Sequence, residues 1–413
     1  MEYCLFYGNA SSPTYAPNGF TDLLNNKSGR DPKYLAPAAV DYSVAPDSPA
    51  AAAGKDLVGS PYFVTNDIFG VLRPQGAWDM GPYEGNGGGE SALAAQAYVR
   101  TNGDDSTGAG TVNSPWATIG YALGHVMSSG IVFVAGGAYK ENVQLTAEKK
   151  SALIRGGFDP VTWAWSPGNQ TTIVNGNGNS AITIAGGADS NTLSYLTLRG
   201  GTNSGRAGIE FTGSAPTLFV EGCSIVSNTY GIYNLRQVAQ ALTIRNSLIA
   251  RNASDGLYFG DQEVSSCRLY NCTVADNGGN GYYAYGGWDD AVPVVKNTLF
   301  TGNNGYGIYK GGWGTGGSMQ YCLFYGNSNG ATWSSTGLAD LGNNMTTNPP
   351  LYWAKAPTYY QLQEFSAAVD TGTNLAALGI TMDLLGVVRP LGGGFDRGAY
   401  EFAIRHGSVF TFR

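Results

Sequence analysis

Hydrophobic and polar positions alternate in short runs through residues 208–327, and the runs recur at a regular interval. Five segments combine a small or polar start, an apolar run and a closing asparagine, and their ends lie 24, 25, 26 and 24 residues apart. They are GCSIVSN, NSLIARN, NCTVADN, NTLFTGN and YCLFYGN, ending at Asn228, Asn252, Asn277, Asn303 and Asn327. A second run follows the first four (GIYN, GLYF, GYYA, GIYK, with GIEF one copy earlier), and a third precedes all five (TLFV, ALTI, CRLY, PVVK, SMQY).

This pattern predicts an all-β fold. Three short strands in a unit of about 25 residues, separated by glycine and asparagine turns, are typical of a right-handed parallel β-helix, in which each unit is one coil stacked on the next.

Equivalent residues of successive coils are expected to form rows, because neighbouring strands lie about 4.8 Å apart. Side chains alternate along a strand, so one row points into the core and the next points outward. The predicted inward row is Ile209, Ile232, Leu257, Tyr282 and Ile308, and the outward row is Glu210, Tyr233, Tyr258, Tyr283 and Tyr309. The closing asparagines are expected to stack too, each side-chain amide bonding the next.

The cysteines support this register. Cys4, Cys223, Cys272 and Cys322 share one position of the coil, where other copies have Ser247 and Thr298. Cys223 and Cys272 would lie two coils apart, about 9 to 10 Å, which is too far for a disulfide. All five cysteines are therefore predicted to be buried free thiols, and they do not indicate a redox compartment.

Residues 98–150 are expected to cover the first coil, because an open coil presents unpaired N–H and C=O groups. The segment 98–126 contains an acidic loop and a helix-like stretch from Pro115 to Val126, and the strand IVFVAGGAYKENVQL follows from Ile131. These residues, with RGGFDPVTWAWSPGNQTTIVNG at 155–176, resemble the N-terminal cap of secreted bacterial parallel β-helix proteins.

The end of the chain resembles the closing module called the choice-of-anchor Q domain. The motifs are YYQLQEFSAAVDTGTN (359–374) and MDLLGVVRPLGGGFDRGAYEF (382–402), with D-x-x-G-x-x-R-P intact at Asp383 to Pro390, whereas the usual S-P-A-I-D-A-G appears as SAAVDTG. The resemblance covers residues 98–402 and implies a secreted or surface-attached β-helix without implying one activity.

The beginning of the chain repeats its end. Residues 2–9 match 320–327, 47–54 match 365–372, and 67–84 match 383–401. The predicted domains are a final coil and cap module of a preceding repeat (1–84), a flexible linker (85–97), the N-terminal cap and first strands (98–150), the β-helix coils (151–330), the C-terminal capping module (331–402) and a tail (403–413).

The first strand of this copy lacks the coils that should lie beneath it, so it is expected to pair with another surface. Head-to-tail self-association into a fibre is the favoured hypothesis, because a heterologous contact that does not close generates a filament. The candidate assembly residues are Tyr3, Cys4, Leu5 and Phe6.

Composition restricts the function. Only 13% of residues are charged and the net charge is −7, which argues against a nucleic-acid partner. No run of 18 apolar residues occurs, so no membrane span is predicted. The 61 glycines and 26 tyrosines suit a secreted β protein with many turns, and an extracellular or cell-surface location is expected.

An aromatic and acidic surface is the first candidate for binding chemistry. Tyr and Trp rings can stack on sugar faces, and carboxylates can bond sugar hydroxyls or coordinate Ca²⁺, which is the candidate cofactor. The same tyrosines could instead stabilise the sheet by cross-strand contacts. The candidate glycan-binding residues are Tyr233, Tyr258, Asp261, Glu263, Tyr283, Trp288, Asp289, Asp290, Tyr309 and Trp313.

Signatures of an enzyme are weak. The two histidines, His125 and His406, lie in the cap and the tail, and no Ser-His-Asp or Cys-His set can be drawn. A polysaccharide lyase that uses Arg236, Lys296 or Lys310 as its base is one alternative that the sequence leaves.

Charged residues also recur in both cap copies: Asp383, Arg389, Asp396 and Glu401 are echoed as Asp67, Arg73, Asp79 and Glu84. An arginine that holds carboxylates to fix an irregular loop explains them, and a cation site is the alternative. The sequence thus favours an extracellular structural repeat protein, with a glycan-binding adhesin and a polysaccharide lyase or glycoside hydrolase as the alternatives.

Overall fold

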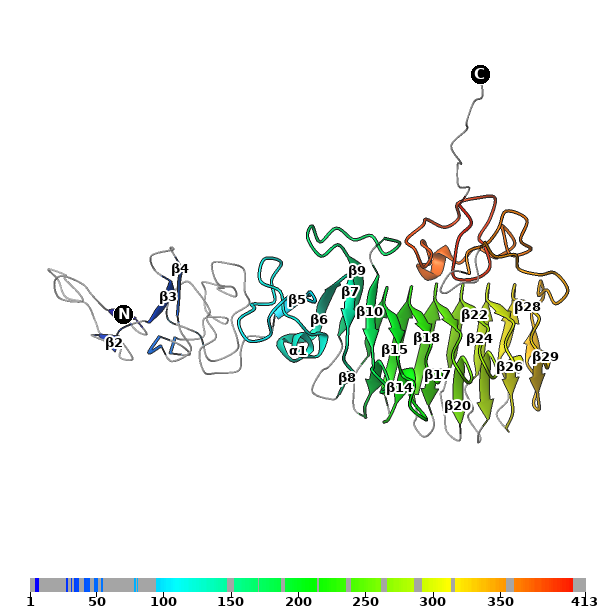
Figure 1. Cartoon of the computed structure of the whole chain (residues 1–413), viewed down its shortest axis with the longest axis horizontal. Helices are drawn as coiled ribbons and strands as arrows, with labels where there is room; N and C mark the ends of the chain where they lie inside the picture. Colours follow the sequence, from blue (N-terminus) through cyan, green and yellow to red (C-terminus); the bar gives the residue numbers. More distant parts are fainter. Residues whose placement is uncertain are drawn as a thin grey trace, which may run out of the picture. The chain divides into compact units, whose positions relative to one another are not determined.

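The computed structural model describes residues 94–403 apart from 147–151, 170, 187–189, 214, 235–238, 261–265, 286–291, 313–315 and 354–359. Within 1–93 it describes 4–6, 27–28, 31, 33–36, 41–44, 48–50, 53–54, 78 and 80. The chain divides into two compact units, Met1–Ala95 and Gln96–Arg413 (Figure 1). None of the helices in the described ranges has the length and apolar character needed to cross a membrane.

The larger unit is a right-handed parallel β-helix built from three sheets, and this confirms the predicted fold class. Sheet 1 contains β5 (Ala94–Val99), β6 (Val126–Ala135), β9 (Leu153–Phe158), β12 (Asn191–Ser194), β15 (Ala215–Glu221), β18 (Ala239–Arg245), β21 (Cys267–Tyr270), β24 (Pro293–Lys296), β27 (Ser318–Gln320) and β30 (Ala339–Asp340).

The other two sheets complete each coil. Sheet 2 contains β7 (Gly137–Tyr139), β10 (Thr172–Asn175), β13 (Thr197–Arg199), β16 (Ser224–Val226), β19 (Leu248–Ala250), β22 (Thr273–Ala275), β25 (Leu299–Thr301) and β28 (Leu323–Tyr325). Sheet 3 contains β8 (Val143–Leu145), β11 (Ile182–Ile184), β14 (Ala207–Phe211), β17 (Tyr230–Asn234), β20 (Leu257–Gly260), β23 (Tyr282–Tyr285), β26 (Tyr306–Lys310) and β29 (Gly330–Ser334).

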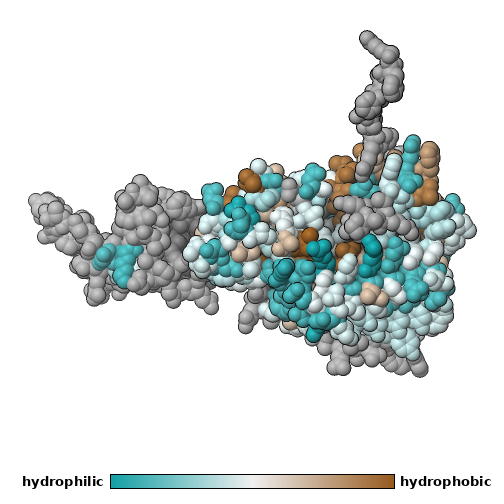
Figure 2. All heavy atoms as spheres, viewed as in Figure 1, coloured by the Kyte–Doolittle hydropathy of each residue, from teal (hydrophilic) through white to brown (hydrophobic). Residues whose placement is uncertain are grey.

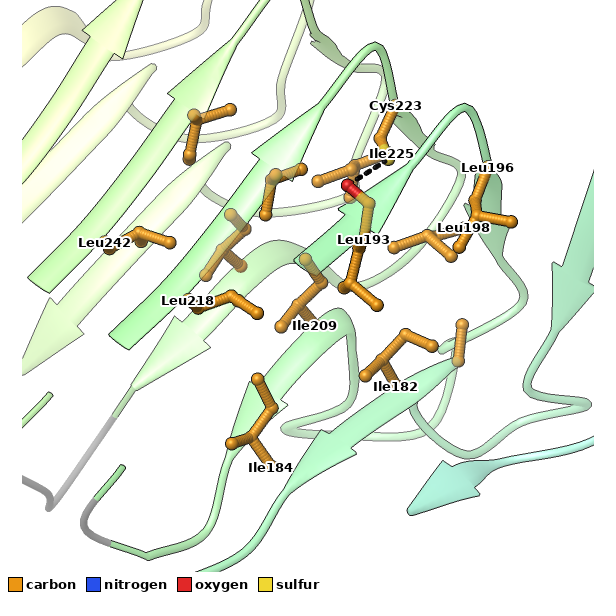
Figure 3. Packing of buried hydrophobic residues seen from close by; sticks show 14 of the residues in the cluster. Ile182, Ile184, Leu193, Leu196, Leu198, Ile209, Leu218, Cys223, Ile225 and Leu242 are labelled. Carbon is orange, nitrogen blue, oxygen red and sulfur yellow. Dashed lines mark hydrogen bonds between the residues drawn. The ribbon is translucent and has the colours of Figure 1, made fainter. Parts of the chain in front are cut away.

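The core lies inside the coils, where every second residue of each strand points inward. The predicted inward row pairs in register, from Ile209 with Ile232 through to Tyr282 with Ile308, and all five side chains are fully buried. Figure 3 shows the same arrangement around Leu193, Ile209 and Ile225, with the Cys223 thiol bonded to the Leu193 carbonyl oxygen at 3.6 Å. The described cysteines are free thiols, as predicted, and all are buried except Cys4, which is partly exposed.

An asparagine ladder stabilises the turn between sheets 2 and 3. Each amide nitrogen donates to the side-chain oxygen of the next asparagine, at 3.2, 3.0, 2.9 and 2.8 Å along Asn228, Asn252, Asn277, Asn303 and Asn327. Each side-chain oxygen also accepts the backbone N–H of the preceding asparagine. The ladder therefore satisfies buried polar groups that a bent backbone leaves unpaired.

Helix α1 (Ile119–His125) covers the first coil. Thr118 caps its N-terminus, and the Glu141 carboxylate accepts the N–H groups of Ile119 and Gly120, both at 2.9 Å. Its apolar side chains, including Ile119 and Leu123, are buried in the β-helix core, and α1 contacts β6 and β8.

The C-terminal module packs along a flank of the β-helix, on the outer face of sheet 2 (Figure 1). It includes the 3₁₀ helix η2 (Ala376–Leu378). Tyr360 and Tyr400 bury the outer side chains Leu248 and Ala250, and the Tyr360 hydroxyl donates to Asp276 at 2.9 Å. Strands β19, β22 and β25 of sheet 2 are consequently buried on both faces, which explains why they read LIA, TVA and LFT without a polar alternation. Figure 2 shows apolar side chains gathered on the exposed surface of this module.

The smaller unit contains β1 (Leu5–Phe6) paired in parallel with β2 (Lys27–Ser28), and β3 (Tyr34–Ala36) paired antiparallel with β4 (Asp41–Val44). Its described bonds recur at matched positions of the C-terminal module. The strand pairing of Leu5 with Lys27 corresponds to that of Leu323 with Met345. The hydrogen bond from Ala50 N to Ser48 Oγ corresponds to the one from Ala368 N to Ser366 Oγ. The hydrogen bond from Gly54 N to Trp78 O corresponds to the one from Gly372 N to Phe395 O.

Candidate functional site

A row of polar side chains runs along the outer face of sheet 1. These residues occupy the last outward position of each strand, because their neighbours Ile154, Leu193, Val220, Ile244, Leu269 and Val295 point into the core. The row consists of Arg155, Ser194, Glu221, Arg245, Tyr270, Lys296 and Gln320, which pair in register from β9 to β27.

This face carries more positive than negative charge. Arg268 lies in the neighbouring outward row on β21, so four basic side chains and one acidic side chain lie between β9 and β24. All five are partly exposed. We call this set the basic strip: Arg155, Glu221, Arg245, Arg268 and Lys296. It contrasts with the chain's net charge of −7.

Arg245 is neutralised within the basic strip. Its guanidinium forms an ion pair with Glu221, donates to the Leu378 carbonyl oxygen at 2.7 Å and lies 4.3 Å from the Phe219 ring centroid. Asn246 donates to the second Glu221 oxygen at 2.7 Å. Arg245 thus links sheet 1 to the C-terminal module.

Arg155 is held differently. Its guanidinium carbon lies 4.5 Å from the ring centroid of Trp165 and 6.0 Å from that of Phe158. Within the described part of the chain, Arg155 has neither an ion pair nor a side-chain hydrogen bond. Stacking therefore orients the guanidinium while its N–H groups stay available to a ligand.

A pocket of about 250 Å³ opens beside Arg155. Strands β9, β12, β15 and β18 form its floor, and residues 379–382 of the C-terminal module form a wall. Hydroxyl groups of Thr192, Ser194 and Thr381 line it together with apolar Leu153 and Met382. The pocket therefore combines a net charge of one positive unit with hydroxyl groups and apolar surface.

The aromatic row predicted on sheet 3 is present, and it is one residue longer than expected. Successive ring centroids of Tyr233, Tyr258, Tyr283 and Tyr309 lie 5.3, 5.0 and 5.0 Å apart, and Trp333 continues the stack 4.6 Å beyond Tyr309. The planes of these pairs differ by 22°, 6°, 8° and 10°. The inner rings cover one another's faces and leave mainly their edges for solvent, so the geometry favours sheet stabilisation over sugar stacking.

Some of the remaining candidate residues lie in the described part of the chain, and the others lie outside it. Lys310 points inward and is fully buried, with its Nζ donating to Thr336 Oγ1 at 2.8 Å, so it is not a surface base. Cys4 is partly buried, and Leu5 and Phe6 form β1. The following candidates lie outside the described residues: Tyr3, Arg236, Asp261, Glu263, Trp288, Asp289, Asp290, Trp313 and His406.

Candidate cation sites have other roles in the described structure. Asp105 accepts the N–H groups of Ala117 and Thr118 and so fixes the start of α1. Hydrogen bonds from Ser106 hold the pKa of Asp104 well below its usual range, as in an ordinary turn. No group of three or more His, Cys, Asp or Glu residues with metal-ligand geometry occurs within the described ranges.

The recurring charged residues of the C-terminal module form a buried cluster. Arg389 donates to Glu401 at 2.6 Å, and Asp383, Asp396 and Glu401 surround this single cation. Burial raises the pKa of Asp396 to about 6 and that of Glu401 to about 7. The Asp383 and Asp396 carboxylates also accept backbone N–H groups of Leu385, Val387 and Asp370. The cluster fixes irregular backbone, as the structural interpretation predicts.

A comparison with protein families agrees with this architecture. The family model described as "Right handed beta helix region" matches residues 180–348. Together with the three sheets, this match defines a parallel β-helix repeat protein.

Two solved structures are similar to the chain. Pectate lyase Pel9A is 12% identical, with a TM-score of 0.42 and coverage of 74% of this chain and 96% of that chain. The pectin methylesterase from Aspergillus niger in deglycosylated form is 18% identical, with a TM-score of 0.39 and coverage of 68% and 93%. A search of curated proteins finds no match.

Proposed function

We propose that this protein is an extracellular or cell-surface β-helix that binds an acidic polysaccharide along the outer face of sheet 1. The observation that carries the proposal is the basic strip, which places four cations and one carboxylate on one face of a chain whose net charge is −7. The resemblance of both caps to secreted β-helix proteins supports the extracellular location.

The basic strip suits a linear polyanion. Its charged groups follow the β-helix axis at intervals of one or more coils, about 4.8 Å per coil. A polymer with a carboxylate on each sugar can meet several of these cations at once, and simultaneous contacts raise affinity beyond that of each single contact. The C-terminal module borders the strip at Leu378 and Thr381 and can keep the bound chain aligned.

The double variant Arg268→Gln, Lys296→Gln is expected to bind a linear oligogalacturonate about tenfold more weakly, since each exposed charge contact contributes roughly 0.7 kcal/mol. Its affinity should also depend less steeply on salt. Isothermal titration of the full chain at two salt concentrations measures both effects.

Arg199→Gln is the matched control, because Arg199 is exposed on sheet 2 and outside the strip. The proposal would be contradicted if the wild-type chain bound a neutral oligogalactan as tightly as the oligogalacturonate. It would also be contradicted if the double variant bound the oligogalacturonate as tightly as the wild type does. Absorbance of unsaturated uronates in the same mixtures would assign a lyase activity instead of binding alone.

A structural, self-assembling role is the second candidate. Sheets 1 and 3 end in β30 and β29, and Trp333 on β29 is 39% exposed at the end of the aromatic stack. The matched hydrogen bonds of the smaller unit support a repeated end module that a second copy could present to these strands. Light scattering is then expected to show a mass that increases with concentration, whereas a constant monomer mass would count against assembly.

A further inference from the structure

The pocket beside Arg155 differs from the rest of the basic strip because elements far apart in the sequence line it. Trp165 positions the Arg155 guanidinium from the loop after β9, and residues 379–382 of the C-terminal module close the opposite side. Gly379 lies in the left-handed region (φ 77°), and a Cβ there would meet the Arg245 guanidinium at 3.4 Å. Arg245 also donates to the Leu378 carbonyl oxygen at 2.7 Å, so the wall contacts the strip.

The charges in the pocket leave one cation for a ligand. Glu221 and the Leu378 carbonyl oxygen already occupy Arg245, whereas Arg155 is held by ring stacking alone among the described residues. An arginine oriented in this way presents a planar fork of N–H donors, which matches the two oxygens of a carboxylate.

The rest of the pocket suits one sugar ring. A volume of about 250 Å³ lies just below the range of about 300 to 1,000 Å³ that is usual for ligand pockets, so the pocket fits one monosaccharide unit. The hydroxyls of Thr192, Ser194 and Thr381 can bond sugar hydroxyls, and Leu153 and Met382 can contact the apolar ring face. Tyr195 adds a phenol, and burial raises the pKa of this group, so it stays a neutral donor.

We infer that this pocket is the specificity subsite for a single uronate residue, with Arg155 binding its carboxylate. The inference rests on the proposed function, since the bound uronate would be one unit of the acidic polysaccharide on the basic strip. Arg155 sets the requirement for a carboxylate, while Arg268 and Lys296 attract the remainder of the polymer.

The test compares galacturonate with its methyl ester, which keeps the sugar and removes the charge. The full chain is expected to bind galacturonate about tenfold more tightly than the ester, as one charge-assisted bidentate contact provides. Arg155→Gln should abolish this difference, and Arg155→Lys should restore only part of it because lysine lacks the fork. Ligand-observed NMR titration measures these weak affinities, and an unchanged unfolding midpoint shows that each variant is folded.

Arg199→Gln, outside the basic strip, is the matched control and should leave the binding of galacturonate and of its ester unchanged. Arg268→Gln should weaken binding of the oligogalacturonate. Equal binding of galacturonate to Arg155→Gln and wild type overturns the inference, and so does sulfate that competes as well as galacturonate. If the oligogalacturonate binds through Arg268 and Lys296 but the monosaccharide does not bind, the uronate subsite is overturned and the proposed function stands. If neither the oligogalacturonate nor the monosaccharide binds, the uronate subsite and the proposed function are both overturned.

Discussion

Replacing Arg389 with methionine is expected to destabilise the C-terminal module by about 4 kcal/mol, because it leaves buried carboxylates without their cation. Arg389 is 4% exposed, and besides Glu401 it donates to the carbonyl oxygens of Gly398 at 2.8 Å and Asp396 at 3.3 Å. Asp383 is fully buried and Asp396 is 2% exposed, so water cannot compensate for the lost guanidinium. We expect the module to open from sheet 2 while the coils stay folded.

Hydrogen exchange followed by mass spectrometry measures this effect segment by segment. Protection should fall in peptides covering 383–401 and persist in those covering β17, β20 and β23, since local stability differs between parts of one chain. Arg199→Gln removes an exposed arginine and should change the free energy of unfolding by less than about 0.5 kcal/mol. Full protection of 383–401 in the methionine variant would show that the cluster does not hold the module.

Replacing Asn277 with alanine is expected to destabilise the β-helix by about 3 kcal/mol, since it leaves several buried polar groups unpaired. The Asn277 amide donates to Ile249 O at 3.1 Å and to Asn303 Oδ1 at 2.9 Å. Its side-chain oxygen accepts the backbone N–H and the amide of Asn252 at 3.2 and 3.0 Å. The site is 1% exposed, so no bulk water replaces these bonds.

Urea unfolding of the full chain, followed by circular dichroism, measures the loss. Asn304→Ala is the matched control because Asn304 is exposed in the equivalent turn of the next coil, where its side chain accepts only the Ser328 hydroxyl among the described contacts. The control should stay within about 0.5 kcal/mol of the wild type. Equal effects of the two substitutions would mean that the ladder contributes no more than a surface turn does.

The fold could be predicted because its signals are local and repeated. A strand that is misassigned in one coil conflicts with the next coil, because residues such as Ile232 and Leu257 must occupy equivalent positions for their strands to pair. The asparagine ladder followed from the same argument. The flank position of the C-terminal module was not predicted, although the unbroken apolar strands LIA and TVA carried a signal that both faces of these strands are buried.

The candidate site was harder to predict. The aromatic residues drew attention to sheet 3, and the spacing that aligns Tyr258 with Tyr283 could not show that their planes differ by only 6° and cover each other. The same alignment applied to sheet 1 would have placed Arg245 above Glu221 and identified part of the basic strip.

The order of residues along the chain determined the three-strand coil, the inward aliphatic row and the asparagine ladder, because each depends on a period of about 25 residues and on side chains that alternate along a strand. Only the folded structure decided which faces are free to bind. The Arg155 pocket joins strands β9, β12, β15 and β18 to residues 379–382, and segments separated by more than two hundred residues meet there because the C-terminal module packs back along the coils.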